Sequence, residues 1–329
     1  MYGVDQAKRA QPGRAGVHAL SLLSIPFNAA ALTALGQGPR PLIELRRETG
    51  SPPQTTMRGH LRALAAEGVV AKTREKDFPG RVDYELTDSG QDLLLVAKVL
   101  ASWLADSPDG PTELGGNAAK NAIRALAEGW GTNIIRALAT RPLTLTELDT
   151  VISGLSYPSL ERRLGAMRTL RQIEPMQASS RGTPYTVTDW LRKSIAPLTA
   201  AARWERRRMR ERAPAITNRD VEAAFLMALP LLRMPADTSG SCRLAVRTLN
   251  SDEAGVIALV RDGTAASCGT RLDAKTDAWA LGPSGSWLSA IIECDVASLE
   301  IGGRADLAGA LVEGLHVELF GSLPVTQDN

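Results

Sequence analysis

The sequence is poor in the residues from which catalytic and metal sites are usually built. Its 329 residues include three histidines and three cysteines, and aromatic residues make up 4% of the chain. His18, His60 and His316 lie far apart, and no cysteine–histidine spacing suits zinc. Neither a Gly-x-Gly-x-x-Gly fingerprint nor a phosphate-binding Gly-Lys-Ser/Thr loop is present. We therefore expect no catalytic residues, no metal, no cofactor and no enzymatic activity.

Long apolar segments and a secretory leader are also missing. The first 16 residues are polar, and no run of about 18 apolar residues occurs anywhere in the sequence. We therefore expect a cytoplasmic protein with no membrane partner. Cys242, Cys268 and Cys294 are odd in number and widely spaced, so we expect buried free thiols rather than a disulfide framework.

The charge is divided unequally between the two parts of the chain. Residues 1–213 carry 30 Lys and Arg against 21 Asp and Glu, a net charge of +9. Residues 214–329 carry 8 against 15, a net charge of −7. A basic front and an acidic back indicate a part that binds a polyanion, joined to a part with a different task.

A segment of about 75–80 residues occurs twice. Residues 84–88 (Tyr-Glu-Leu-Thr-Asp) and Trp103 recur 101 positions later as residues 185–189 (Tyr-Thr-Val-Thr-Asp) and Trp204. Another set recurs 103 positions later: Leu35, Pro39, Leu42, Glu44 and Leu45 match Leu138, Pro142, Leu145, Glu147 and Leu148. Two nearly equal offsets predict a duplicated module. A polar Pro/Gly linker at 105–117 joins the copies.

Within one copy, the pattern predicts three short helices, a β-hairpin and a longer helix. In the third helix, at 54–67, Met57, Leu61 and Leu64 share one face, and Gly68 ends it. Two β-rich segments flank a polar tip, and an amphipathic stretch follows at 89–104. This order is that of a winged helix-turn-helix, whose third helix enters the major groove of DNA.

Residues 61–70 and 82–90 (Val-Asp-Tyr-Glu-Leu-Thr-Asp-Ser-Gly), together with Trp103, resemble the HxlR family of winged-helix regulators, which is related to MarR. The resemblance covers about 25–105 well. The second copy, about 128–205, is more diverged: Arg171 replaces Gly68, and the wing at 179–184 is shorter. The resemblance implies a transcriptional regulator that binds double-stranded DNA. Two copies in one chain imply a monomer that acts as a pseudo-dimer, or a homodimer, on an imperfect palindrome.

The candidate DNA contacts lie on the two recognition helices and their wings. We expect Arg58 to contact a guanine, and we expect the second copy to bind more weakly because Glu161 faces phosphates. For any single arginine a solvated helix face remains the alternative, and so it does for the cluster at 203–212. The candidates in the first copy are Gln54, Thr55, Thr56, Arg58 and Arg62 on the helix, and Arg74, Lys76 and Arg81 in the wing. Those in the second copy are Ser159, Arg162, Arg163 and Arg181.

Residues 214–329 alternate between strand and helix patterns. Strands are expected at 242–249, 254–261, 264–271, 277–281 and 299–302, and helices at 218–233, 284–292 and 305–320. Asp262-Gly263 predicts a hairpin turn. The expected fold class is therefore α+β: two tandem winged helix-turn-helix modules followed by an α+β domain with an antiparallel sheet and an apolar cavity. The expected boundaries are 18–104 and 118–213 for the modules, 105–117 for the linker and 214–329 for the last domain.

Residues 277–293 and 299–320 resemble the C-terminal part of sterol-carrier-protein-2-like domains, whose helices and sheet enclose an apolar cavity. The resemblance implies a hydrophobic small-molecule effector, with core packing as the alternative for each candidate. The candidate lining residues are Phe225, Leu226, Trp279, Trp287, Ile291, Leu311, Leu315 and Phe320. We expect a ligand-responsive transcriptional regulator; the alternative is a protein that sequesters a toxic apolar compound for self-resistance and binds DNA secondarily.

Overall fold

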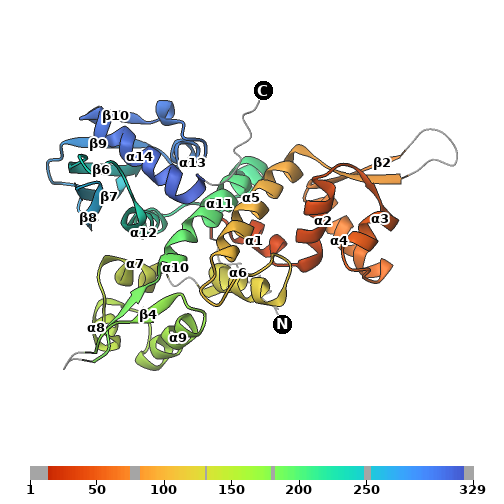
Figure 1. The fold of residues 1–329 in the computed structure, drawn as a ribbon, viewed down its shortest axis with the longest axis horizontal. Coiled ribbons are helices and arrows are strands. Elements are labelled where there is room, and N and C mark those ends of the chain that lie inside the picture. Colours follow the sequence, from red (N-terminus) through yellow and green to blue (C-terminus); the bar gives the residue numbers. More distant parts are fainter. Residues whose placement is uncertain (1–13, 75–81, 130–131, 179–181, 248–252, 322–329) are drawn as a thin grey trace, which may run out of the picture.

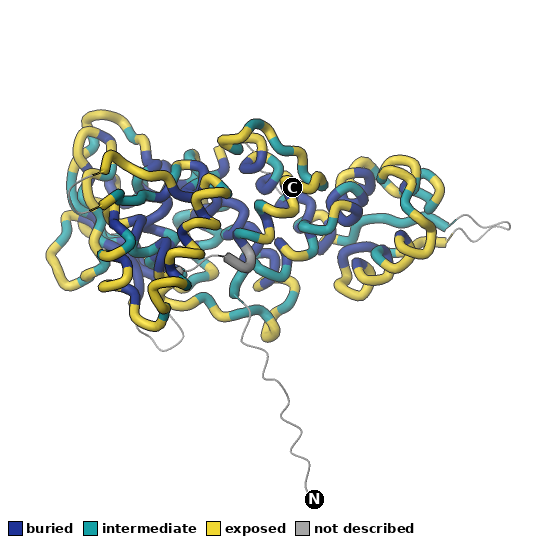
Figure 2. The backbone as a smooth tube through the Cα atoms, turned by 90° about the horizontal axis from the view of Figure 1, so that it is seen from below, coloured by how far each residue is buried: buried dark blue, intermediate teal, exposed yellow. Residues whose placement is uncertain are grey.

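The chain folds into three parts that follow one another along the sequence (Figure 1). The structure is a computed structural model, and it describes residues 14–74, 82–129, 132–178, 182–247 and 253–321. We call α1 to α5 the first module, α6 to α11 the second module, and α12 to α14 with their strands the C-terminal domain. Seen from below, the molecule is elongated, with the first module at one end (Figure 2).

The first module has the element order of a winged helix-turn-helix. Its elements are α1 (Val17–Leu23), α2 (Pro26–Leu35), β1 (Arg40–Pro41), α3 (Leu42–Glu48), α4 (Gln54–Ala66), β2 (Val70–Arg74), β3 (Val82–Leu86) and α5 (Asp88–Ala105). The three strands pair antiparallel in the order β1-β3-β2. Met57, Leu61 and Leu64 are buried, as their helical spacing predicts, so the opposite face of α4 is left to solvent.

The second module repeats this order of elements. It comprises α6 (Asn117–Gly129), α7 (Thr132–Thr140), α8 (Leu145–Val151), α9 (Tyr157–Thr169), β4 (Ile173–Pro175), β5 (Tyr185–Val187), α10 (Asp189–Lys193) and α11 (Ile195–Met209), which ends in η1 (Arg210–Arg212). Leu143 forms an isolated antiparallel bridge with Tyr185, at the place where Arg40 pairs with Tyr84 in the first module. Buried Leu160, Leu164 and Met167 hold α9 in place.

In each module, a threonine at the equivalent position links the wing to the helix that follows it. Thr87 caps α5 by accepting from the Gly90 amide, and its hydroxyl donates to the carbonyls of Gly68 and Val69. Thr188 caps α10 by accepting from the Leu191 amide, and its hydroxyl donates to the carbonyls of Arg171 and Gln172. The Thr-Asp pair of the repeated segment is thus an N-cap and the first helical residue, which is where these residue types stabilise a helix.

Helices α5 and α11 pack against each other and join the two modules. The Trp103 and Trp190 rings stack with centroids 4.4 Å apart, and each indole donates to the other residue's carbonyl, at 2.8 and 3.0 Å. The Trp204 indole donates to the carbonyl of Ser89 at 2.9 Å. Trp204 corresponds to Trp103 and Trp190 corresponds to Ser89, since each pair is 101 positions apart. The bond from Trp103 to Trp190 and the bond from Trp204 to Ser89 are therefore equivalent, with the donor in a different module each time.

A buried carboxylate attaches α1 to α11. Glu205 is 1% exposed, and its oxygens accept from the amides of Gly16 at 2.7 Å and Ala19 at 3.1 Å. Gly16 has a φ of 87°, and a Cβ there would lie 3.0 Å from the Leu198 carbonyl oxygen. The close approach therefore needs glycine. Leu104 occupies the equivalent place in the first module, so this contact breaks the internal symmetry.

The C-terminal domain has a five-stranded sheet in the order β10-β9-β6-β7-β8. Its elements are α12 (Asn218–Ala228), η2 (Leu229–Leu231), β6 (Gly240–Arg247), β7 (Glu253–Arg261), β8 (Thr264–Gly269), β9 (Ala278–Pro283), α13 (Ser284–Glu293), η3 (Val296–Ser298), β10 (Glu300–Gly303) and α14 (Ala305–Phe320). The predicted hairpin is confirmed: Asp262 and Gly263 both have positive φ and join β7 to β8.

The prediction of an antiparallel sheet is wrong for one pair of strands, since β6 and β9 run parallel; the pairs β6–β7, β7–β8 and β9–β10 are antiparallel. The chain does not form a hairpin between β8 and β9. It crosses from the edge strand β8 to the opposite side of β6, so β9 lies beside β6 and runs in the same direction. Helix α12 packs against β7, while α13 and α14 pack against β9 and β6.

The expectation of three buried thiols holds for one cysteine only. Cys242 is buried, and burial raises the pKa of its thiol to about 12. Cys268 is half-buried, and Cys294, which ends α13 in a left-handed conformation, is exposed. The described residues contain no group of three or more His, Cys, Asp or Glu that could hold a metal ion. Among them, no single helix is long and apolar enough to cross a membrane; α1 and α2, bent by 85°, meet that test only together.

The replacement of Gly68 by Arg171 gives a stability prediction. Arg171 has a φ of 55°, close to the 69° of Gly68. A left-handed conformation costs a non-glycine residue roughly 1–2 kcal/mol. Glycine avoids this strain but loses more backbone entropy on folding, which offsets part of the gain. Arg171→Gly should therefore raise the free energy of unfolding by about 0.5–1 kcal/mol, measured by denaturant titration. Its exposed ion pair with Asp109 contributes little.

The matched control is Gly68→Arg. No atom lies within 4 Å of a Cβ built on Gly68, so only backbone strain opposes the change. This variant should lose about the amount that Arg171→Gly gains. Equal stabilities of both variants and the parent would show that the left-handed conformation carries no cost at these positions.

Glu205 gives a prediction about pH. Burial raises the pKa of its carboxyl group, so the folded state holds the proton more tightly than the unfolded chain. Stability must therefore fall as the pH rises from the ordinary glutamate pKa of about 4.3 toward the raised folded value. Glu205→Gln cannot titrate and removes this fall. The stability of the parent minus that of the variant, measured by thermal unfolding, should decrease as the pH rises above the ordinary glutamate pKa; a constant difference would contradict the assignment.

Candidate nucleic-acid interface and apolar cavity

The solvent face of α4 presents the polar residues that the sequence marks for DNA contact. Gln54, Thr55, Thr56, Arg58 and Arg62 are all exposed, whereas Met57, Leu61 and Leu64 of the same helix are buried. The five side chains therefore form one continuous polar surface on a helix of 13 residues. The dimensions and polarity of this surface suit the major groove of DNA.

The arginines of this surface are not neutralised by the protein. Within the part of the chain that the structure describes, Arg58, Arg62 and Arg74 form no ion pair. Arg74 is exposed at the end of β2, at the base of the wing. Lys76 and Arg81, the other two candidates of this wing, lie outside the described residues. Cations held in solvent without an acidic partner are available to phosphate or to base edges.

His60 faces the protein rather than this surface. Its ring stacks on Phe27 with centroids 5.3 Å apart, and the residue is half-buried. The contact links α4 to α2, so the histidine has a packing role.

The second module presents a basic surface on α9 that also carries a carboxylate. Arg162 and Arg163 are exposed and form no ion pair among the described residues, while Ser159 is half-buried. Exposed Glu161 occupies the place that Arg58 has on α4. Arg181, the candidate of the second wing, lies outside the described residues. The two recognition helices thus differ in charge at equivalent positions.

The densest basic cluster of the sequence, at 203–212, mainly joins parts of the protein. Arg203 and Arg207 both pair with Glu293 at the end of α13. Arg208 donates two hydrogen bonds to Asp92 on α5. These pairs attach α11 to the C-terminal domain on one side and to the first module on the other, which favours the structural alternative for these three residues.

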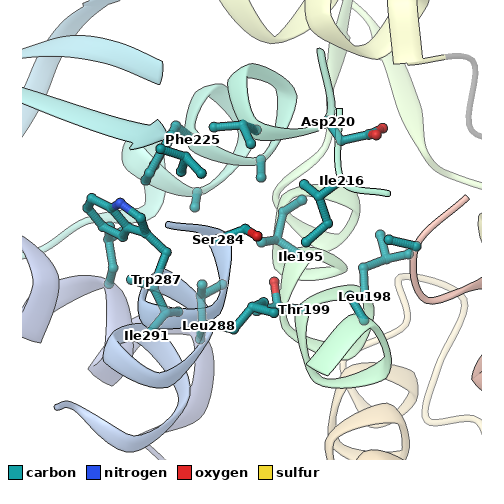
Figure 3. Close-up of a pocket in the computed structure, with 18 of the residues that line it drawn as sticks. Ile195, Leu198, Thr199, Ile216, Asp220, Phe225, Ser284, Trp287, Leu288 and Ile291 are labelled. Carbon is teal, nitrogen blue, oxygen red and sulfur yellow. The ribbon is translucent and has the colours of Figure 1, made fainter. Parts of the chain in front are cut away.

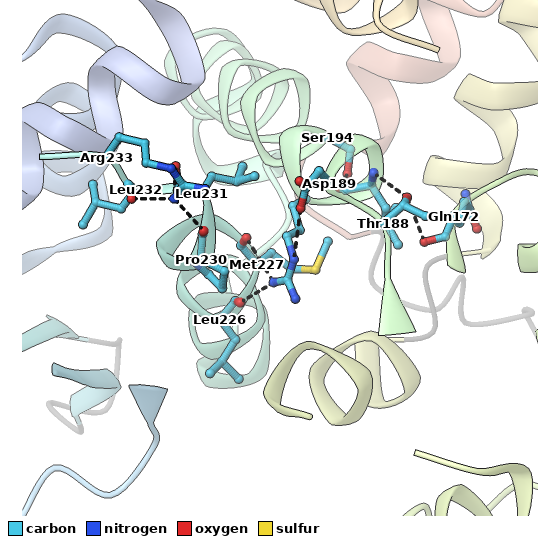
Figure 4. A network of polar contacts seen from close by, with 12 residues as sticks. Gln172, Thr188, Asp189, Ser194, Leu226, Met227, Pro230, Leu231, Leu232 and Arg233 are labelled. Atoms are coloured by element: carbon cyan, nitrogen blue, oxygen red, sulfur yellow. Dashed lines mark hydrogen bonds and ion pairs between the residues drawn. The ribbon is translucent and has the colours of Figure 1, made fainter. Parts of the chain in front are cut away.

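The C-terminal domain is attached to the second module by a buried arginine. Arg192 of α10 is 8% exposed, and its guanidinium donates to the carbonyls of Leu226 and Met227 at 3.0 and 3.4 Å (Figure 4). Those carbonyls belong to the last turn of α12, where a cation is favourable. Burial lowers the pKa of Arg192. Arg136 of α7 also pairs with Glu222 of α12 at 2.6 Å, so α12 is held by two elements of the second module.

An apolar cavity of about 140 Å³ lies where α11, α12, α13 and α14 meet (Figure 3). It is bounded by both the second module and the C-terminal domain. Phe225 and Trp287 meet edge to face on one side of it, with centroids 5.1 Å apart. The residues that α11 contributes are Ile195, Leu198, Thr199 and Ala202.

The structure brings four of the eight predicted lining residues to this cavity: Phe225, Trp287, Ile291 and Leu315. Leu226 and Leu311 lie in the closed core, at 1% and 0% exposure. Trp279 packs against Gly302 on the neighbouring strand, and Phe320 borders a separate hollow beside Trp103. The sequence did not indicate the α11 residues as lining residues, because their helical pattern lies in the part of the chain assigned to DNA binding. No local signal shows that a second domain covers that face.

Polar groups at the cavity are few. The Trp287 indole donates to the Ala245 carbonyl at 2.8 Å and is therefore satisfied. The hydroxyls of Thr199 and Ser284 form no hydrogen bond with any described residue. Arg14 and Asp220 form a partly exposed ion pair, 3.2 Å long, at the border of the cavity. The cavity thus offers an apolar body with two unused hydroxyl groups.

Comparisons with known proteins match the first module. The family model described as HxlR-like helix-turn-helix matches residues 24–109. A relative from Halalkalibacterium halodurans, described as an uncharacterized HTH-type transcriptional regulator, is 33% identical over 60 residues, which are 18% of this chain. The chain spans about half of that relative's length, 53%. Residues 24–109 are therefore an HxlR-like helix-turn-helix segment, and the family model makes no statement about the rest of the chain.

Solved structures give matches of similar extent. A MarR-family protein from Enterococcus faecalis V583 is 28% identical, with a TM-score of 0.25, over 26% of this chain and 78% of that one. Diamide-treated YodB from B. subtilis is 27% identical, with a TM-score of 0.26, over 27% and 87%. The regulator ytfH from Salmonella typhimurium is 23% identical, with a TM-score of 0.26, over 31% and 88%.

The position of the cavity leads to a prediction about stability: two truncations, one in the closed core and one at the cavity, should lower the free energy of unfolding by different amounts. Leu311→Ala removes a side chain that is enclosed on all sides and should cost about 2–5 kcal/mol of stability. Ile291→Ala should cost clearly less, because one side of Ile291 already faces the cavity. Denaturant titration of the full chain measures both. Equal costs would indicate that the cavity is filled by side chains in solution.

Proposed function

We propose that this protein is a transcriptional regulator that binds double-stranded DNA through both winged modules of one chain. The observation that carries the proposal is the solvent face of α4, where Arg58 and Arg62 stand without acidic partners beside Gln54, Thr55 and Thr56. The HxlR-like match at 24–109 supports it. The wing residues Arg74, Lys76 and Arg81 are assigned to phosphate contacts, which add affinity and salt dependence rather than sequence choice.

We further propose that the two modules are duplicates that act as a pseudo-dimer. The repeated element order, the equivalent threonine caps and the indole–carbonyl bond made twice, from α5 to α10 and from α11 to α5, support this assignment. Regulators of this type usually bring two recognition helices together by pairing two chains. Because Glu161 stands where Arg58 does, the two half-sites should differ, and the natural target is an imperfect palindrome.

The third element of the proposal is a hydrophobic small-molecule effector in the C-terminal domain, which we assign to a sterol-carrier-protein-2-like type. The support is the apolar cavity beside Phe225, Trp287, Ile291 and Leu315. A net charge of −7 in residues 214–329 makes this domain unsuited to DNA contact. An effector alters DNA binding only if it binds the DNA-competent and incompetent arrangements unequally.

The DNA-binding proposal is tested by selection. The full chain is used to enrich duplexes from a randomised pool, and the enriched sequence is measured by fluorescence anisotropy at several salt concentrations. The expected outcome is one enriched site with two unequal halves, bound by one chain. Recovery of no sequence above background, together with weak and purely salt-dependent binding, would contradict sequence-specific regulation.

A pair of substitutions tests the two recognition helices against each other. Arg58→Ala should weaken binding to the enriched duplex by about 1–3 kcal/mol and relax one base position. Glu161→Ala at the equivalent place should cause no loss, because a carboxylate near phosphates is repulsive. Anisotropy titrations of both variants provide the measurement. A larger loss for Glu161→Ala would reverse the assignment and indicate a contact to a cytosine amine.

A further inference from the structure

We propose that the cavity binds a compact, uncharged compound of one or two rings that carries a hydroxyl or carbonyl oxygen, and that the bound compound holds α11 against the C-terminal domain. The inference rests on the proposed function, because it specifies the effector and how the effector reaches the DNA-binding modules. It assigns Thr199 and Ser284 as the residues that select the oxygen.

The size of the cavity sets the class of compound. Its volume is about 140 Å³. An apolar cavity of roughly 150 Å³ in another protein accommodates benzene. A single ring or a compact pair of rings therefore matches this space. A long acyl chain is too large for this volume, so much of it would extend beyond the cavity.

The wall chemistry sets the polarity of the compound. At the inner end, Phe225, Ile291 and Leu315 offer no hydrogen bond, and the Trp287 indole already donates to Ala245. A polar group buried there would lose its hydration without replacement. Thr199 and Ser284 have hydroxyls without a hydrogen bond among the described residues, and Figure 3 shows both oxygens directed toward the central part of the cavity. One oxygen on the compound would satisfy them.

The position of the cavity connects it to both modules through α11. One face of α11 lines the cavity with Ile195, Leu198 and Thr199. The same helix packs on α5, where the Trp204 indole donates to Ser89. Residues 14–16 also run from the cavity border to Glu205, because Arg14 pairs with Asp220 and the Gly16 amide donates to Glu205. A compound that fills the cavity therefore stabilises contacts that fix α1 and α11.

The binding test uses 1-naphthol, naphthalene and palmitate with the full chain, by isothermal titration calorimetry. We expect saturable one-to-one binding of 1-naphthol, weaker binding of naphthalene, and palmitate weakest of the three. Thr199→Val and Ser284→Ala should each weaken 1-naphthol roughly three- to tenfold and leave naphthalene unchanged, since a neutral hydrogen bond is lost. The matched control is Ser267→Ala, an exposed serine on β8, which should leave the affinity for 1-naphthol unchanged.

Three results would overturn the site. These are no saturable binding of 1-naphthol, palmitate binding at least as tightly as 1-naphthol, or equal affinities of Thr199→Val, Ser284→Ala and the parent for 1-naphthol. Ala224→Phe, which places a ring in the cavity from α12, should abolish binding while the circular dichroism spectrum stays that of the parent. Retained 1-naphthol binding in this folded variant would also overturn the assignment.

The connection to the modules has a readout that does not need DNA. Saturating 1-naphthol should slow amide hydrogen exchange across Ile195–Met209 and Val17–Leu23, as well as in α12 and α13. Slowing confined to α12 and α13 would overturn the connection. Affinity for the selected duplex should then change by fivefold or more with the ligand; an unchanged affinity would overturn the effector role and leave sequestration. A chain that binds 1-naphthol but no duplex would refute the proposed function and leave the ligand site standing.

Discussion

The packing of α5 on α11 is the constraint on which the rest of the structure depends. Trp190 of α10, the short helix directly before α11, stacks on Trp103 of α5, and the Trp204 indole of α11 donates to Ser89 of α5. These contacts fix how α10 and α11 lie on α5. Thr87 caps α5 directly after the first wing, and Thr188 caps α10, which leads into α11, directly after the second wing. The position of one recognition helix relative to the other is therefore set by this contact. Large buried aromatic side chains with satisfied polar atoms suit this task, because they combine extensive packing with a defined geometry.

Several differences between the two modules lie in contacts that the second module makes with other parts of the chain. Helix α11 uses one face for the cavity and another for α5. Arg192 caps α12, and Glu205 attaches α1, and neither residue has a counterpart of its own type in the first module. The second module thus makes structural contacts through residues that differ from those of the first. Arg58 on α4 and Glu161 on α9 are a further difference, on exposed helix faces.

A buried charge is tolerated in each of these contacts because helix ends satisfy it. Glu205 accepts from amides at the start of α1, and Arg192 donates to carbonyls at the end of α12. Burial still disfavours the charged form of both groups, raising the pKa of one and lowering that of the other. Free backbone groups at helix ends supply several directed hydrogen bonds at once, which a single surface ion pair does not. These contacts therefore specify how the parts join as well as stabilising them.

The sequence by itself determined the local structure: the spacing of Met57, Leu61 and Leu64, the Thr-Asp caps, the Asp262-Gly263 turn and the repeat all act over a few residues or a fixed offset. It also identified the exposed polar face of α4, since burial of one helix face implies the other. Only the tertiary structure decided the direction of β9 beside β6, the exposure of Cys294 and the place of the cavity. Half of the predicted lining residues lie elsewhere, and Thr199 was missed, because amphipathic spacing shows which face is buried but not which distant element covers it.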